Sequence, residues 1–402
     1  MNKVLKGLVV SLLLLISLTG CWSRTELTDL AIAVALGIDK NNKGEFVVSV
    51  QIINPSETAI SQNSGGGYDT PVTTYTSKGK ILFEAIRRLS KEVPRRVYLA
   101  HLRMVVIGEE VAKSGLYDAL DILSRDHELR TDFYLIVAKE QTAEDTLKIL
   151  TSIEKIPANK LFFSLEKSAE IWAATGKVKL NNLMDDIVSE GIQPTLTGVT
   201  IVGDPKDGLT KSNVESISPN TIFTYTGIAA FRKNKLVGWL NEDESKGFNY
   251  IKDHVTNTVV VFEVNNDDVG VELIRTKTKI VPHIKNGEIS IKVNVTGEAN
   301  VGEVNTELDL MNPHVIGELE SLVNNDIRNS IEKAVEKAQN DFESDIFGFG
   351  ERIHKTLPKE WEKIKQEWVK LFPEVPVNVN VRIKIRRIGT ISNPFHNELT
   401  EE

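Results

Sequence analysis

The chain contains 402 residues, of which 48 are Lys or Arg and 56 are Asp or Glu, so its formal net charge is −8. An acidic chain is a poor binder of nucleic acid, and its charge does not favour adhesion to anionic lipid headgroups. The single cysteine excludes an intramolecular disulfide. The length exceeds the ~250–300 residues at which one hydrophobic core usually stops growing, so two or three domains are expected.

Residues 1–20 have the pattern of a secretory signal peptide. Two positive charges, Lys3 and Lys6, precede an apolar run that ends at Leu18 and is too short to span a bilayer as a mature helix. Cys21 is then the first residue of the predicted mature chain, the position that accepts lipid in bacterial lipoproteins. We therefore expect lipidation at Cys21 rather than a buried core thiol. The acyl chains tether such a protein to a membrane, because each buried CH₂ contributes about 0.8 kcal/mol to the free energy of membrane binding.

Residues 21–150 alternate between strand-like and helix-like patterns, which predicts an N-terminal α+β domain. The Gly-rich stretch 64–67 is interpreted as a loop, because no helix begins behind it to bind phosphate. Thr142 opens a predicted capping box and a short helix. The other elements, in chain order, are a segment leading into a strand over 26–38, a strand over 46–53, a helix over 80–93, a strand over 97–107, a helix over 109–124 and a strand with Phe133, Leu135 and Val137 on one face.

The pattern over residues 151–203 predicts a smaller middle unit that is mainly helical. Two helical stretches, over 161–175 and 180–189, precede a short strand over 196–202. Residues 204–220 then carry Asp-Pro, Asp-Gly and Ser-Pro dipeptides, a composition that suits a linker between domains.

Residues 221–390 predict a C-terminal domain with an antiparallel sheet and a long helix, followed by a tail over 391–402. An amphipathic stripe over 314–342 predicts a helix roughly 40 Å long at 1.5 Å per residue. A second helical stretch begins after Pro358. A period of two indicates strands over 223–231, 235–240, 255–264, 280–284 and 289–295, with Asn286-Gly287 as the turn of a hairpin between the last two.

The final strand has the clearest alternation in the chain. From residue 377 to 385, Val and Ile alternate with Asn, Arg and Lys. This pattern predicts that Val381 and Ile383 lie in the core and that Arg382 and Lys384 are exposed.

No arrangement in the sequence specifies an active site. The seven histidines are scattered, without the i,i+3 or i,i+4 spacing of a zinc site. Ser-x-x-Lys matches begin at Ser152, Ser164 and Ser330, but the partner motifs of penicillin-recognising enzymes are missing and chance predicts roughly two such matches. We therefore predict no enzymatic activity, no cofactor, and no catalytic, cofactor-binding or metal-binding residue.

Two charged segments favour surface contacts. Residues 125–132 concentrate charge between a helix and a strand; an acid/base set is one interpretation, and a salt-bridged connection or a protein contact is the more common one. A basic stretch is interpreted as a solvated face, with a docking surface as the alternative. It comprises Arg87, Arg88, Lys91, Arg95 and Arg96.

Several blocks of the sequence, in order, resemble one known family. They are Gly20-Cys21-Trp22-Ser23-Arg24-Thr25-Glu26-Leu27 with residues 31–39, His101-Leu102-Arg103-Met104-Val105-Val106-Ile107-Gly108-Glu109-Glu110 with residues 120–130, Lys235-Leu236-Val237-Gly238-Trp239-Leu240, and Asp345-Ile346-Phe347-Gly348-Phe349-Gly350. Over about residues 20–390 they are similar to the C-subunit lipoproteins of spore germinant receptors, the Ger(x)C family. Ser23 stands where an acidic residue often follows the Trp in that family, which affects local contacts only.

The resemblance implies a three-domain α+β protein with mixed sheets and flanking helices, lipid-anchored to the outer face of the inner spore membrane. It implies assembly with two integral membrane subunits, an A-type and a permease-like B-type, into a receptor that starts germination in response to nutrients. Only lipidation, at Cys21, transfers to a named residue.

Two other classes remain as alternatives. A solute-binding lipoprotein of a membrane transporter would share the anchor and the acidic body, but such proteins usually have two α/β lobes. A cell-envelope hydrolase is disfavoured because nucleophile, base and metal signatures are missing.

Overall fold

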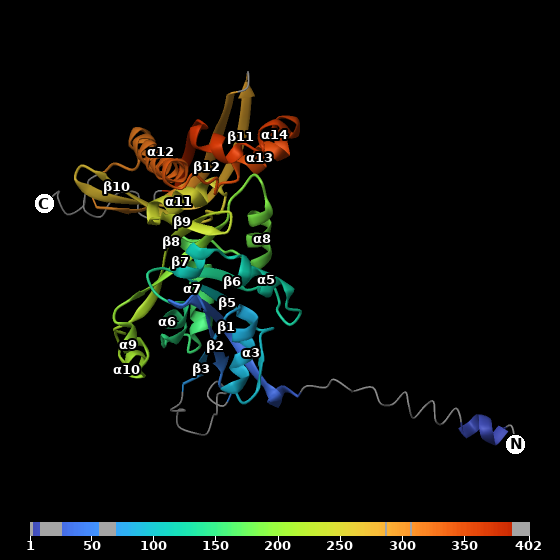
Figure 1. Cartoon of the computed structure of the whole chain (residues 1–402). Helices are drawn as coiled ribbons and strands as arrows, with labels where there is room; N and C mark the ends of the chain where they lie inside the picture. Colours follow the sequence, from blue (N-terminus) through green and yellow to red (C-terminus); the bar gives the residue numbers. More distant parts are fainter. Residues whose placement is uncertain (1–2, 9–25, 56–69, 286–287, 306–307, 388–402) are drawn as a thin grey trace.

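The structure, a computed structural model, describes residues 3–8, 26–55, 70–285, 288–305 and 308–387. Within these ranges the chain forms two mixed β-sheets with helices packed against them, so the predicted α+β class is confirmed. The first sheet occupies the middle and lower part of Figure 1, and the second sheet lies at the top. Among these residues, no helix combines membrane-spanning length with sufficient apolar character.

The first sheet has the strand order β3-β2-β1-β5-β6-β7-β8-β9, and β4 pairs with β1 beside this path. β1, β5, β6 and β7 run parallel to one another, and antiparallel strands flank them on both sides. β2 has the bounds that the sequence predicts. The strands are β1 (Leu30–Lys40), which follows the 3₁₀ turn η1 (Leu27–Asp29), then β2 (Phe46–Ile53), β3 (Val72–Gly79), β4 (Arg96–Tyr98), β5 (Met104–Gly108), β6 (Tyr134–Ala138), β7 (Thr195–Val202), β8 (Ile222–Arg232) and β9 (Lys235–Leu240).

Helices cover both faces of the first sheet. One hydrophobic cluster contains Phe133, Leu135 and Val137, as predicted for one face of this strand. The alternate residues of β6 lie in a second cluster on the opposite face, so the whole strand is buried. The first face is covered by α3 (Leu82–Arg88) with the 3₁₀ turn η2 (Leu89–Lys91), α4 (Glu109–Ser114), α5 (Tyr117–Arg125) and α8 (Leu180–Val188), and the second by α6 (Ala143–Lys148) and α7 (Pro157–Ile171).

Around the first sheet, one predicted strand and one predicted helix are each interrupted in the structure. The strand expected over 97–107 is two short strands, β4 and β5, and the helix expected over 109–124 is two helices, α4 and α5. The second break lies at Gly115, whose φ of 123° is incompatible with a continuous helix. The Gly-rich stretch 64–67 and the hairpin turn 286–287 lie outside the described residues.

The expected linker over 204–220 connects two strands of the same sheet. It contains the short helices α9 (Pro205–Gly208) and α10 (Ser212–Glu215), and the side-chain amide of the buried Asn213 bonds the backbone of Thr221. β7 and β8, on either side of it, pair antiparallel from Thr195 with Ala230 to Val202 with Ile222. The strands over 222–240 therefore lie in the first sheet, and the two sheets divide after β9.

The second sheet has the order β10-β11-β12-β13. The strands are β10 (Thr258–Val264), β11 (Asp267–Lys285), β12 (Glu288–Val304) and β13 (Val377–Arg387). β10, β11 and β12 are antiparallel neighbours, but β13 runs parallel to β12, so the prediction of an antiparallel sheet is wrong for its last strand. Parallel pairing needs a long crossover, and the helices between β12 and β13 supply it.

Helices cover one face of the second sheet, where they share its hydrophobic core (Figure 1). The predicted long helix is α12, extended by the π-helical turn η3. α11 and α13 were not predicted, although Asn241 and Glu244 form a capping box at the start of α11. These helices are α11 (Glu242–Ile251), α12 (Pro313–Glu336), η3 (Lys337–Asp341), α13 (Phe349–Thr356), α14 (Pro358–Ile364) and α15 (Trp368–Leu371), followed by the 3₁₀ turn η4 (Phe372–Glu374).

Candidate functional site

Cys21, the predicted lipidation site, lies outside the described residues. Within the described ranges, no group of three or more His, Cys, Asp or Glu side chains is arranged to hold a metal ion. In two of the Ser-x-x-Lys matches the lysine forms an ion pair with a carboxylate. Lys167 pairs with Glu170 at 2.8 Å, and Lys333 pairs with Asp243 at 3.4 Å.

The two charged segments singled out in the sequence meet in the fold. Arg96, from the basic stretch, forms an ion pair with Glu128 of the 125–132 segment. Within the latter segment, Arg130 pairs with Asp132 at 3.4 Å. The 125–132 segment is therefore a salt-bridged connection, as the more common interpretation predicts, and exposed pairs of this kind contribute little to stability.

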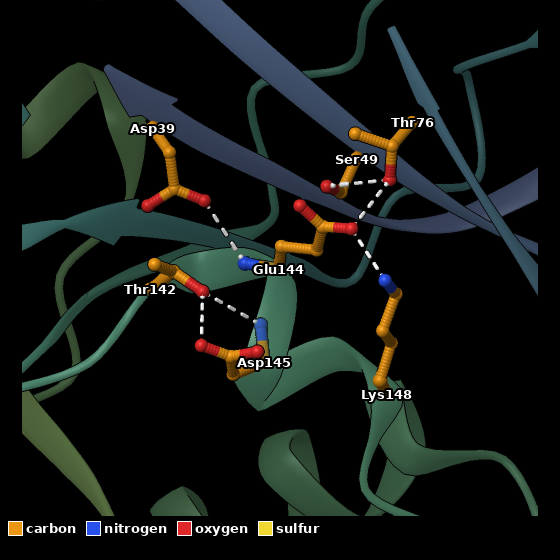
Figure 2. A network of polar contacts seen from close by, with 7 residues as sticks. All are labelled: Asp39, Ser49, Thr76, Thr142, Glu144, Asp145 and Lys148. Carbon is orange, nitrogen blue, oxygen red and sulfur yellow. Dashed lines mark hydrogen bonds and ion pairs between the residues drawn. The ribbon is translucent and has the colours of Figure 1, made fainter. Parts of the chain in front are cut away.

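Asp39 lies at the end of β1 and binds the N-terminus of α6 (Figure 2). Its carboxylate accepts hydrogen bonds from the backbone N–H of Ala143 at 2.8 Å and of Glu144 at 3.0 Å, two groups that have no partner within the helix. Gly108 on the neighbouring strand leaves room for this carboxylate, since a Cβ there would lie 2.0 Å from its Oδ1 atom. Burial raises the pKa of Asp39 to about 6, and the two amide hydrogen bonds limit this shift.

A polar network extends from α6 to the edge of the sheet, as Figure 2 shows. Glu144 forms an ion pair with Lys148 and accepts a hydrogen bond from the Thr76 hydroxyl at 3.1 Å, and that hydroxyl lies 3.2 Å from the Ser49 hydroxyl. Thr142 caps α6 by accepting from the Asp145 N–H at 3.0 Å. The network thus fastens α6 to strands β1, β2 and β3.

We expect the stability difference between the wild type and Asp39→Asn to depend on pH. The folded-state pKa of Asp39, about 6, lies above its ordinary value of 3.8, so the folded protein binds this proton more tightly than the unfolded chain. The resulting stabilisation is fully present below the ordinary pKa and is lost as the pH rises through about 6, with a total change of ~3 kcal/mol.

Urea unfolding of both proteins between about pH 4 and pH 7 measures this effect. The wild type should lose stability relative to Asp39→Asn as the pH rises. A difference that is constant over this range contradicts the assignment.

Asp345 is a second buried carboxylate, with 4% of its surface exposed. It lies in the loop before α13, where Gly348 adopts a φ of 78°. Oδ1 accepts from the N–H groups of Gly348 at 2.9 Å and Phe349 at 3.1 Å, and Oδ2 accepts from the Gly350 N–H at 2.8 Å and Trp368 Nε1 at 3.0 Å. Burial raises the pKa of Asp345, and these four donors oppose the shift.

The same loop joins the two sheets. Glu351 donates its backbone N–H to the Gly191 carbonyl at 2.8 Å, and Gln193, just before β7, donates its backbone N–H to the Asp345 carbonyl at 2.8 Å. The backbones at Gly191 and Glu351 are in such close contact that a Cβ on Gly191 would lie 2.4 Å from the Glu351 nitrogen. One block of the family resemblance, residues 345–350, therefore forms the junction between the first and second sheets.

The described chain is thus a two-sheet α+β protein in which buried carboxylates bind backbone amides and hold its parts together. Comparison with known families identifies it further. Residues 23–201 match the family model described as the spore germination protein N-terminal domain, and residues 226–389 match the model of the spore germination B3/GerAC-like C-terminal domain. The chain belongs to this family of spore germination proteins.

Relatives match nearly the whole chain. Spore germination protein KC of Bacillus subtilis (strain 168) is 35% identical over 98% of each chain, and spore germination protein B3 of the same organism is 24% identical over 95% of this chain and 97% of that protein. The crystal structure of the GerBC protein superposes with a TM-score of 0.53 at 19% identity, covering 87% of this chain and 96% of that chain. This last similarity supports the fold alone.

No local pattern marks Asp39 as a helix-binding carboxylate, because its partners are 104 and 105 residues away. Asp39 and Asp345 both lie in blocks of the family resemblance, but the resemblance gives neither of them a role. The nearby glycines at 348 and 350 were a local signal for a tight turn around Asp345.

Proposed function

We propose that this protein is the lipid-anchored C subunit of a nutrient germinant receptor and that it acts by assembly rather than by catalysis. The observation that carries this proposal is the similarity to spore germination proteins over 98% of the chain. In the proposed arrangement, the protein sits on the outer face of the inner spore membrane with two integral membrane subunits, an A-type and a permease-like B-type.

The signal pattern before Cys21 motivates the anchor. We expect Cys21→Ala to abolish labelling with radioactive fatty acid and to leave the signal peptide uncleaved by the lipoprotein peptidase, because the substitution removes the thiol that accepts the lipid. Ser23→Ala, which keeps the cysteine, is the matched control. Equal labelling of Cys21→Ala and wild type contradicts the proposed anchor.

A deletion strain tests the receptor role. We expect loss of the protein to abolish the response to one class of nutrient, because a receptor subunit acts before the machinery that all germinants share. Germination induced by calcium dipicolinate should continue, since it does not depend on nutrient detection. The proposal fails if the deletion strain germinates normally on every nutrient, given confirmed expression in the parent and no paralogous receptor.

A further inference from the structure

A cavity of about 240 Å³ lies where the first sheet meets α11. Four buried apolar side chains line it: Leu196 on β7, Ile228 on β8, Phe248 on α11 and Ile346 in the junction loop. Mainly polar residues from β7, from α8 and from the loops around it line the remainder, and the titratable ones are Asp185, Asp186, Lys177, Lys252 and His254. Small-molecule sites combine an apolar wall with converging polar groups that orient the ligand, and this cavity has both.

The charged side chains that line this cavity are not joined in direct ion pairs. Within the described part of the chain, the side chains of Asp186, Lys177 and Lys252 form no ion pair within 4.0 Å and no side-chain hydrogen bond. Asp186 is only partly exposed, so water solvates it incompletely. Burial raises the pKa of Asp186 to about 6; the positive charge of Lys252 reduces this shift, and the negative charges of Glu351 and Asp185 add to it. A partly buried carboxylate without a directly bonded cation costs free energy that a cationic ligand would recover.

The signs of these charges restrict the ligand. An anion alone would be attracted to Lys177 and Lys252 but repelled by Asp185 and Asp186, and a cation alone would be repelled by the two lysines. A molecule with an ammonium group at one end and a carboxylate at the other satisfies both sets through charge-assisted hydrogen bonds. The volume, equivalent to about eight water molecules at roughly 30 Å³ each, restricts the ligand to a small one.

We propose that this cavity binds a small zwitterion, with its ammonium group on Asp186, its carboxylate on Lys252 and Lys177, and its aliphatic part against the apolar wall. This inference goes beyond the proposed receptor role and does not depend on it. A binding measurement on the purified protein therefore tests it separately from any germination phenotype.

The test is ligand-observed NMR with the full chain purified in detergent. The zwitterionic probes are 5-aminopentanoate and valine, and the single-charge probes are pentylamine and pentanoate. We expect the zwitterions to bind at least tenfold more tightly than the single-charge probes, a difference of ~1.4 kcal/mol. Asp186→Asn and Lys252→Met should each weaken zwitterion binding at least tenfold.

Asp118→Asn, a neutralisation of an exposed carboxylate on α5 away from the cavity, is the matched control and should leave binding unchanged. Melting temperatures check folding; Asp186→Asn is isosteric and removes an unpaired charge, so its melting temperature should not fall. The proposal is overturned if neither zwitterion binds the wild type, if either cavity variant binds as tightly as the wild type, or if Asp118→Asn weakens binding equally.

Discussion

Replacement of Asp345 by Ala is expected to lower the free energy of unfolding by about 3–5 kcal/mol. The substitution removes one carboxylate but leaves four donors without a partner: three backbone N–H groups of residues 348–350 and Trp368 Nε1. The carboxylate is 4% exposed, so little water can take its place. A change in the conformation of residues 345–351 would also disturb their backbone hydrogen bonds to Gly191 and Gln193.

Urea unfolding followed by tryptophan fluorescence measures this effect, because Trp368 donates directly to the carboxylate. Asp341→Ala is the matched control. Asp341 is exposed and, among the described residues, forms an ion pair with Lys337 alone, at 3.2 Å, so its replacement should cost no more than about 1 kcal/mol. Similar losses from the two substitutions would show that the Asp345 hydrogen bonds do not stabilise the junction.

Replacement of Ile383 by Ala is expected to cost about 2–5 kcal/mol, because it removes buried methyl and methylene groups and leaves a cavity. Ile383 is fully buried on the inner face of β13, in the core shared with α12. The substitution keeps the backbone N–H that donates to Asn324 Oδ1 at 2.7 Å, so the strand should remain attached to α12.

Lys384→Ala is the control for the same strand. Its side chain is 52% exposed and forms an ion pair with Glu320, so we expect a loss between about 0 and 1 kcal/mol. Urea unfolding of both variants measures the difference. Equal losses would contradict the two faces assigned to β13.

Elements with a strong periodic pattern were predictable from sequence. The alternation over 377–385 predicted the buried Val381 and Ile383 and the exposed Arg382 and Lys384, and the structure confirms these four assignments. The stripe over 314–342 likewise corresponds to α12 and η3. These patterns can be read locally because side-chain direction repeats every two residues in a strand and every 3.6 in a helix.

Strand pairing, by contrast, depends on contacts between distant parts of the chain. Turn-forming residues over 204–220 indicated a linker, yet they connect β7 and β8 in one sheet, because a connection rich in turn residues can also lead back to an adjacent strand. The direction of β13 had no local signal either. It runs parallel to β12 because the helices between the two strands carry the chain back across the sheet.

Residue order and local spacing were enough to indicate the signal pattern, the candidate lipidation site Cys21, the α+β class and the family resemblance. The buried carboxylates and the charged cavity arise only when the chain folds. Asp39 binds backbone groups of α6 that lie 104 and 105 residues later in the sequence. Asp186 and Lys252 line one cavity but belong to separate segments. Such contacts form only where packing of the hydrophobic core brings distant segments together. The local spacing of residues therefore cannot predict them.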